Sequence, residues 1–143
     1  MVSFASGCSF LTELFVFNKS KHTVAVRFSF EPRSRSEEGA SLTAYKITGW
    51  NNNLPEIGDT VKVYARPEGD SVWYAELPSN CALVIASDLN LDLQNEVSCK
   101  QFLCGLIKLE VLSPNDANFT CADTLCYSRL ITLGKARGGF VIE

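Results

Sequence analysis

The sequence has 143 residues, of which 46% are hydrophobic and 20% are charged, and its formal net charge is −3. This length and apolar content fit one domain, 1–143, that can bury its own core, which excludes wholesale disorder. The acidic balance excludes a protein that coats nucleic acid non-specifically, because that affinity depends on basic side chains that neutralise phosphates. No apolar run approaches the roughly 20 residues of a membrane-spanning helix. The N-terminus also lacks the basic segment of a secretory signal, so we expect an intracellular protein.

Hydrophobic and polar residues alternate along most of the chain, a pattern typical of strands that are buried on one face. The pattern is clearest at residues 23–30, where the side chains predicted to face the core are Val24, Val26, Phe28 and Phe30. Residues 10–17 are expected to form the hairpin partner of this strand, with a polar turn at residues 18–21. A charged stretch bounded by Pro and Gly predicts a mobile loop near residues 32–40.

The middle of the chain predicts one strand followed by a hairpin. The strand covers residues 42–50, and the segment 51–59, rich in Asn, Pro and Gly, is expected to be a turn or a short helical connection. Residues 60–66 and 72–77 form the two arms of the hairpin. The inward residues of its first arm are Val61 and Val63.

The C-terminal half continues mainly as strands. An apolar run at residues 81–86 predicts a buried strand, and residues 95–104 predict a short helix. Alternation returns at residues 107–111 and again at 127–133, where the strand is expected to end at a Gly-containing segment. Residues 140–142 predict a final strand or an exposed apolar tail.

Roughly eight or nine short strands with almost no helix leave a barrel or a sandwich as the architecture. We predict an all-β fold: an OB-like small barrel with additional strands and at most one or two short helices. A closed or partly open barrel of this kind would leave few strand edges exposed.

No group of residues points to catalysis, so we predict that the protein is not an enzyme and needs no cofactor. The single histidine, His22, lies in a predicted turn, whereas a hydrolytic triad needs a base beside its nucleophile and a third group that orients it. His22 with Asn80 and Cys81 resembles the catalytic set of some thiol acyltransferases and proteases. Those families begin a helix at the cysteine, but here a strand-like apolar run follows it.

The cysteines are predicted to be reduced thiols in the core, because a chain of this size and apolar content does not need disulfides. The alternative is a zinc site, since two pairs of cysteines share the same spacing and four thiolates suit tetrahedral zinc. Its ligands would be Cys99, Cys104, Cys121 and Cys126. The intervening residues lack a Gly-rich knuckle, so no metal is predicted.

Aromatic and basic side chains alternate between residues 44 and 77. If they share one surface, bases could stack on the rings and phosphates could contact the cations. The candidate nucleic-acid or ligand face consists of Tyr45, Lys46, Trp50, Lys62, Tyr64, Arg66, Trp73 and Tyr74. The structural alternative is that the tryptophans close the end of a barrel.

Within this stretch, a strand ending near Trp50 leads through Leu54-Pro55 to a Gly-Asp-Thr-Val-Lys-Val run at residues 58–63, and then to a hairpin arm with Trp73. This order resembles OB-fold subunits of the replication protein A and telomere end-binding kind, over roughly 35 residues. The resemblance implies a nuclear rather than cytoplasmic protein in a complex that handles single-stranded nucleic acid or telomeres.

Part of the same segment, the two hairpin arms at residues 61–66 and 72–77, also resembles the first hairpin of a Tudor or Agenet module. Such modules bind methylated lysine or arginine in a cage of three or four aromatic rings. Tyr64, Trp73 and Tyr74 could contribute, but successive residues of a strand face opposite sides, which weakens this interpretation.

A surplus of apolar residues in the C-terminal third predicts an exposed surface that binds a protein partner. Its members are Phe102, Leu103, Leu106, Phe119, Phe140 and Ile142. Residues 1–50 carry six basic and four acidic side chains (+2), and residues 51–143 carry seven and twelve (−5). We therefore predict a binding and assembly subunit whose main contact is a protein, within a nucleic-acid-associated complex. The alternatives are a Tudor-like reader and a direct binder of single strands.

Overall fold

The computed structural model describes residues 9–30, 42–69, 71–113 and 119–143, so the loop predicted near residues 32–40 lies outside the described residues. The strands of the described residues are β1 (Leu11–Asn18), β2 (Val24–Phe30), β3 (Ala44–Asn51), β4 (Leu54–Val61), β5 (Tyr64–Gly69), β6 (Val72–Leu77), β7 (Cys81–Leu89), β8 (Leu106–Leu112), β9 (Phe119–Cys121), β10 (Ile131–Thr132) and β11 (Arg137–Ile142). The helices are α1 (Glu96–Leu103) and the 3-10 helix η2 (Asp123–Arg129). The predicted all-β class is confirmed.

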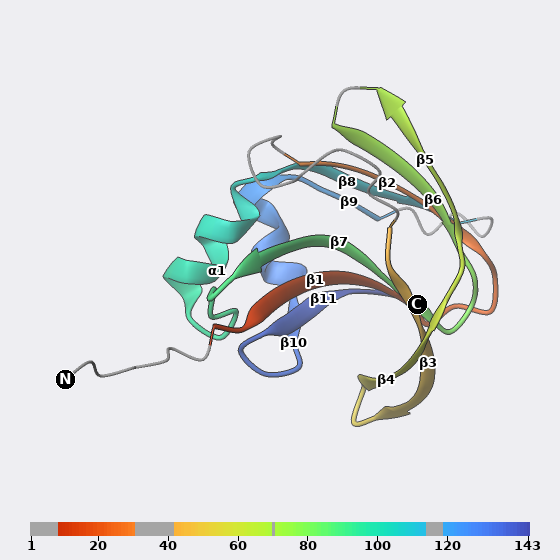
Figure 1. Cartoon of the computed structure of the whole chain (residues 1–143), viewed down its shortest axis with the longest axis horizontal. Helices are drawn as coiled ribbons and strands as arrows, with labels where there is room; N and C mark the ends of the chain where they lie inside the picture. The colour runs from red at the N-terminus through yellow and green to blue at the C-terminus, as the bar shows by residue number, and fades with distance from the viewer. Residues whose placement is uncertain (1–8, 31–41, 70, 114–118) are drawn as a thin grey trace.

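The strands form two sheets that pack face to face (Figure 1). Sheet A has the strand order β10-β11-β1-β7-β3-β4, and sheet B has the order β5-β6-β2-β8-β9. Strands β1 and β11 pair in parallel, and the other pairs of described strands are antiparallel. The hydrogen-bonded pairings of the described residues thus form two sheets and do not close into one ring.

The core lies between the two sheets and contains the residues expected from the alternating pattern. The side chains of Val24, Val26 and Phe28 are at most 1% exposed, so this prediction is confirmed. Val61 and Val63 are half-buried and pack against the edge of the core. These two therefore face inward but contribute less buried area than the residues of β2.

Strand β1 is buried on both faces, because Thr12 to Asn18 are all shielded from solvent. Leu14 and Val16 face sheet B, whereas Phe15 and Phe17 pack on the opposite side in a second cluster with Ile47 and Ala82. A central strand covered on both faces has no alternation to reveal its register. The predicted hairpin of residues 10–17 with residues 23–30 is wrong, because β1 pairs with β7 and β11 in sheet A while β2 belongs to sheet B.

Asn18 holds the corner at which the chain leaves sheet A for sheet B. Its buried Nδ2 donates hydrogen bonds to the carbonyl oxygens of His22 (2.8 Å) and Leu77 (2.9 Å). Its main-chain carbonyl accepts a hydrogen bond from the N–H of Asn80. One side chain therefore joins the β1–β2 connection to the β6–β7 connection.

The segment 51–59 is mostly strand, so the expected turn or helical connection is wrong over most of its length. Asn52 and Asn53 have φ angles of 52° and 65°, the positive values that a two-residue hairpin turn requires at both positions. The turn therefore occupies two residues, and β4 begins at once at Leu54. The predicted strand 60–66 is divided, because the chain passes from sheet A to sheet B at residues 62 and 63.

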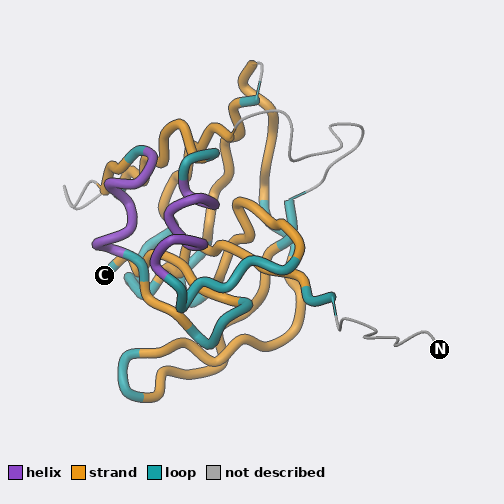
Figure 2. Tube along the Cα trace, turned by 90° about the vertical axis from the view of Figure 1, so that its left-hand side faces the viewer, coloured by secondary structure: helices purple, strands orange, loops and turns teal. Residues whose placement is uncertain are grey.

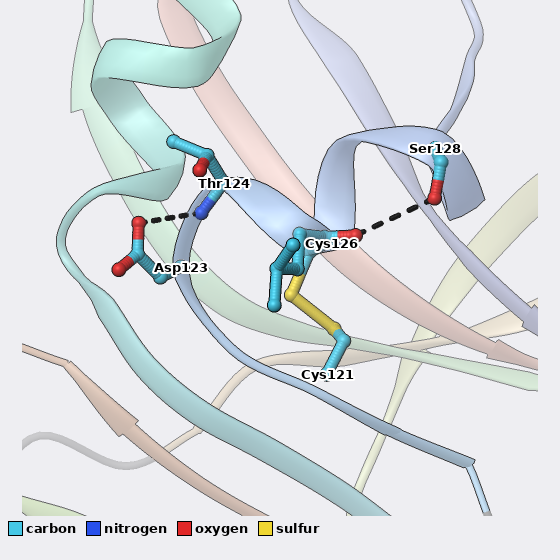
Figure 3. The surroundings of a disulfide bond; sticks show 6 residues. Cys121, Asp123, Thr124, Cys126 and Ser128 are labelled. Atoms are coloured by element: carbon cyan, nitrogen blue, oxygen red, sulfur yellow. Dashed lines mark hydrogen bonds between the residues drawn. A yellow bond between two sulfur atoms is a disulfide. The ribbon is translucent and has the colours of Figure 1, made fainter.

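Helix α1 confirms the helix predicted at residues 95–104, with Asn95 as its N-cap. The strand predicted at 127–133 is wrong over its first half, because residues 123–129 form η2, which packs beside α1 (Figure 2). A disulfide between Cys121 and Cys126 holds their Cα atoms 5.3 Å apart (Figure 3). An extended chain of this length would span about 16 Å, so the bond requires a turn.

Gly138 and Gly139 lie inside β11, although the sequence predicts that they end a strand. A Cβ atom on Gly139 would overlap the carbonyl oxygen of Phe15 on the parallel strand β1. Glycine is therefore required because β11 approaches its neighbour closely, and the strand continues through the pair.

Candidate functional site

The outer face of sheet B carries a row of charged and aromatic side chains that crosses four strands. In the strand register Arg66 lies opposite Tyr74, Tyr74 opposite Arg27, and Arg27 opposite Glu110. Side chains on the same strands extend this row. We call the whole set the arginine–tyrosine face; its members are Arg27, Tyr64, Arg66, Glu68, Tyr74, Glu76, Lys108 and Glu110.

The alternation of each strand explains why these side chains face outward. In β2, Val26 and Phe28 point into the core, so Arg27 between them must point away from it. In the adjacent row of the sheet, Phe28 lies opposite both Trp73 and Leu109. That row packs against the core, so the burial of the core fixes the orientation of the outer face.

Glu68 links the two arginines of the face. One of its carboxylate oxygens accepts a hydrogen bond from Nε of Arg27 at 2.5 Å, and the other accepts one from Nη2 of Arg66 at 3.3 Å. Arg27 also donates to Glu110 through Nη1 at 3.2 Å, and Lys108 lies 3.9 Å from the same carboxylate. The result is a connected network of charges rather than isolated ion pairs.

The network shifts the protonation equilibria of its members. The hydrogen bond from Arg27, followed by the charges of both arginines, lowers the pKa of Glu68 below its ordinary value of 4.5. The pKa of Arg27 is raised, mainly by its hydrogen bond to Glu68. The pKa of Arg66 is raised, first through its contact with Tyr64 and then through Glu68. All three groups are therefore charged at neutral pH.

Both guanidinium groups also lie over the ring of Tyr74. Cζ of Arg66 is 4.8 Å and Cζ of Arg27 is 5.7 Å from the ring centroid. Tyr64 meets Tyr74 edge-on, with centroids 6.4 Å apart, and accepts a hydrogen bond from Arg66 at 3.4 Å. Stacking and hydrogen bonding together hold Arg66 in one orientation while half of its side chain remains exposed.

The face is electrically balanced. Its three cationic side chains are matched by three carboxylates, and Arg27 and Arg66 already hold carboxylate partners. Phosphate contacts gain affinity from cations that are free to replace counterions. This face therefore offers little attraction for nucleic acid, although it carries the arginine and tyrosine side chains that the sequence singled out.

The structure divides the predicted nucleic-acid or ligand face. Tyr64, Arg66 and Tyr74 lie together on sheet B, and Lys62 is exposed where the chain crosses between the sheets. The expectation that Trp73 accompanies Arg66 is wrong, because the register places Tyr74 there and directs Trp73 toward the core.

The remaining three residues of that prediction, Tyr45, Lys46 and Trp50, belong to β3 in sheet A. Lys46 is exposed, whereas Tyr45 and Trp50 are half-buried and pack against the cluster of Phe15 and Phe17. The Nε1 atom of Trp50 is buried and has no hydrogen-bond acceptor among the described residues. Lys19 lies over its ring, with Nζ 5.1 Å from the centroid.

Five residues of the arginine–tyrosine face were not among the predicted site residues: Arg27, Glu68, Glu76, Lys108 and Glu110. The alternation at residues 23–30 already places Arg27 on the outward side. Its contacts with Glu68 and Glu110 come from strands far apart in the chain, 41 and 83 residues away. No local pattern in the sequence identifies those two partners.

The predicted exposure of the C-terminal apolar residues is wrong. Each of the six is at most 8% exposed, because the strands and α1 bury them in the core between the sheets. They are Phe102, Leu103, Leu106, Phe119, Phe140 and Ile142. A fold with two packed sheets needs more core residues than a small barrel. Residues that would be surplus in a barrel therefore belong to the core here.

The prediction of reduced thiols is wrong for Cys121 and Cys126, which form the disulfide, and the alternative zinc site loses two of its ligands to that bond. Cys81 and Cys99 are buried free thiols, and Cys104 is exposed. Burial raises the pKa of Cys99 to about 11. In the part of the chain that the structure describes, no cluster of three or more His, Cys, Asp or Glu side chains suits a metal ion.

Comparison with known proteins gives no match: no family model, no curated protein and no solved structure is similar to this chain. Within the described ranges, neither helix has the length and apolar composition needed to cross a membrane. The geometry of the surfaces is therefore the main evidence for a function.

Proposed function

We propose that the chain is a non-catalytic binding and assembly subunit, and that it contacts a protein partner through the arginine–tyrosine face. The observation that carries the proposal is the stack of Arg66 on Tyr74, half exposed and fixed by Tyr64 and Glu68. Arginine and tyrosine are enriched at the energetic centres of protein interfaces. Because these side chains are already ordered, they would lose less conformational entropy when a partner binds.

The strand edges support binding through a face rather than through strand addition. In the described residues the edge strands are β4, β5, β9 and β10. Two of them are short, with three residues in β9 and two in β10. The other two contain Pro55 and Pro67, and proline cannot donate to a neighbouring strand.

We further propose, on the OB-fold resemblance alone, that the complex is associated with single-stranded nucleic acid or telomeres and that other subunits supply the positive charge. A nuclear location belongs to this part of the proposal. The Cys121–Cys126 disulfide argues against a nuclear location, since such bonds persist mainly in oxidising compartments. The Tudor-like alternative has less support, because Arg66 occupies the position over Tyr74 that a ligand cation would take.

The test is co-purification from the native cell with tagged wild-type chain, Arg66→Glu and Tyr74→Ala. Val97→Ala is the matched control, because Val97 is 77% exposed on α1, an element that contributes nothing to the arginine–tyrosine face. We expect a stoichiometric protein partner that both face variants lose and the control retains. In parallel, the isolated chain should not bind a labelled single-stranded oligonucleotide at low salt. Salt-sensitive oligonucleotide binding that Arg66→Glu abolishes would replace the proposal with direct nucleic-acid binding.

A further inference from the structure

A pocket on sheet A lies apart from the arginine–tyrosine face, which belongs to sheet B. The pocket has a volume of about 590 Å³, within the range of roughly 300–1,000 Å³ that is typical of ligand-binding sites. It is lined mainly by residues of β4 and of the β10–β11 region, which are at opposite ends of sheet A. Figure 1 shows β10 and the β3–β4 hairpin extending from β1 and β11 on the same side, away from β2 and β8 of sheet B. The pocket therefore lies where the two ends of a curled sheet approach a common space.

One wall of the pocket is aliphatic and rests on an ordered apolar cluster. Phe15 and Phe17 form this cluster on the face of sheet A that turns away from sheet B, and both rings are fully buried. Ile57 of β4 and Leu133, which follows β10, pack against the cluster and also line the pocket. Both are half-buried. Each of them therefore has apolar surface left for a ligand.

Arg137 of β11 places a guanidinium group on the same face as this wall. Its main-chain oxygen accepts a hydrogen bond from the N–H of Leu133 at 2.7 Å, in line with the β10–β11 register. Residues directly opposite each other on neighbouring strands share a face. Its Cζ lies 5.9 Å from the centroid of the Phe15 ring, and its Nε donates to Glu13 at 3.3 Å. These contacts place the guanidinium beside the aliphatic wall.

Glu13 fixes the guanidinium of Arg137 and leaves one end of it free. Glu13 is buried on β1, directly opposite Arg137 in the register, and it holds only Nε. The nitrogens Nη1 and Nη2 have no hydrogen-bond partner among the described residues, and the Arg137 side chain is 45% exposed. A ligand can therefore reach two N–H donors that match the two oxygens of a carboxylate. Lys135 on the same hairpin adds a second positive charge.

The charge that faces the aliphatic wall is positive. Glu56 is also a lining residue, but its carboxylate lies beside Gly49, its register partner on β3. The alternation of β4 places that carboxylate on the face opposite to Ile57. Among the lining residues, Arg137 is thus the charged residue on the face of Ile57 and Leu133. One cation beside an aliphatic wall matches a ligand with one anionic end and an apolar chain.

We propose that this pocket binds a medium-chain fatty acid, with its carboxylate on Nη1 and Nη2 of Arg137 and its alkyl chain against Ile57 and Leu133. A carboxylate is favoured over a phosphate, because the charge of Glu13 already offsets part of the positive charge and a single negative charge suits what remains. An alkyl chain is favoured because both wall residues are aliphatic.

The experiment is a calorimetric titration of the full wild-type chain with octanoate, octanamide and butanoate. Octanamide keeps the chain but removes the charge, and we expect it to bind about tenfold more weakly than octanoate. Butanoate keeps the charge but has four fewer methylene groups, and it should also bind at least about tenfold more weakly. N-acetyl-leucyl-leucine offers the same carboxylate at the end of a peptide and should bind no more tightly than octanoate.

Methyl NMR of the wild-type chain then locates the bound octanoate. The methyl resonances of Ile57 and Leu133 should shift on titration, because the alkyl chain contacts them. Those of Val97 and Leu125, which are exposed on α1 and η2, should not shift. These measurements need no variant and so do not depend on the folding of one.

The double variant Glu13→Gln/Arg137→Gln tests the carboxylate contact. It removes both charges together, so that no buried carboxylate is left without its partner. Octanoate should then bind as weakly as octanamide, while the affinity for octanamide stays unchanged and shows that the pocket is intact. The matched control is Glu96→Gln/Lys100→Gln, which removes an ion pair of α1 outside the pocket and should change neither affinity.

No saturable binding of octanoate at millimolar concentration would overturn the proposal. Octanamide that binds as tightly as octanoate, or methyl shifts that spare Ile57 and Leu133, would also overturn it. Tighter binding of N-acetyl-leucyl-leucine than of octanoate would overturn the assignment to a fatty acid in favour of a peptide C-terminus. None of these results bears on the arginine–tyrosine face, because the two sites share no residue.

Discussion

Arg66 and Tyr74 lie directly opposite each other in the β5–β6 register, and the guanidinium of Arg66 is 4.8 Å from the centre of the tyrosine ring. Arg27 stabilises this arrangement, because it also contacts the ring and shares Glu68 with Arg66. Three strands thus contribute to the position of one exposed guanidinium. This is the feature on which we base a binding role.

The charge network predicts a specific pH dependence of stability. Because the pKa of Glu68 in the folded state is lowered from 4.5, its contribution to stability is present above pH 4.5 and is lost as the pH falls through the lower folded-state value. Urea denaturation between pH 6 and pH 3 should show that acid lowers the free energy of unfolding less in Glu68→Gln than in the wild type. Identical pH profiles for the two proteins would contradict the shift.

The core account predicts a large effect at Phe28, whose side chain is 1% exposed between the sheets. Phe28→Ala should lower the free energy of unfolding by about 3–5 kcal/mol, because it removes a buried ring and leaves a cavity. Val97→Ala, at an exposed site, should change it by less than about 0.5 kcal/mol. A loss below about 1 kcal/mol for Phe28→Ala in denaturant melts would mean that the assigned core face is wrong.

The disulfide predicts a redox-dependent stability. It links residues five apart in sequence and fixes the turn of η2. In the chain-entropy description a loop this short contributes about 2 kcal/mol. The double variant Cys121→Ser/Cys126→Ser should be less stable by about that amount, and a reducing agent should destabilise only the wild type. Equal stability of the wild type with and without reductant would contradict the bond.

The three free thiols of the described residues should differ sharply in reactivity. Cys104 is exposed, whereas Cys99 is buried with a pKa of about 11, and the pKa of Cys81 is also raised by burial. Since the thiolate is the reactive form, a thiol reagent at pH 8 should modify Cys104 in the folded chain and reach Cys81 and Cys99 only after unfolding. Mass spectrometry of the labelled peptides distinguishes these sites. Equal rates of modification at Cys81, Cys99 and Cys104 would show that the reagent reaches the core of the folded chain.

The sequence predicts the fold best where burial is one-sided. The alternation at residues 23–30 correctly gives the inner face of β2, and the short helix predicted at residues 95–104 is confirmed as α1. The sequence prediction fails at β1, because a strand buried on both faces has no alternation. The local hairpin that the sequence suggests there does not form, because β1 pairs with distant strands of sheet A. The paired asparagines show a related limit, since composition indicates a turn there but not its length of two residues.

The site was only partly predictable for a similar reason. The alternation of β5 correctly places Tyr64 and Arg66 on one exposed face. Which residue of β6 joins them depends on the register, and a shift of one residue exchanges Trp73 for Tyr74.

Site-specific photo-crosslinking in the native cell tests the central claim most directly. A photoreactive phenylalanine analogue replaces Tyr64, which is 53% exposed beside Arg66, or Leu125, which is 77% exposed on η2, as the control. The account predicts a crosslinked product of discrete mass from position 64, sensitive to protease and unchanged by nuclease, with none from position 125. A product from position 64 that nuclease removes, or equal protein products from both positions, would contradict a protein-binding role for the arginine–tyrosine face.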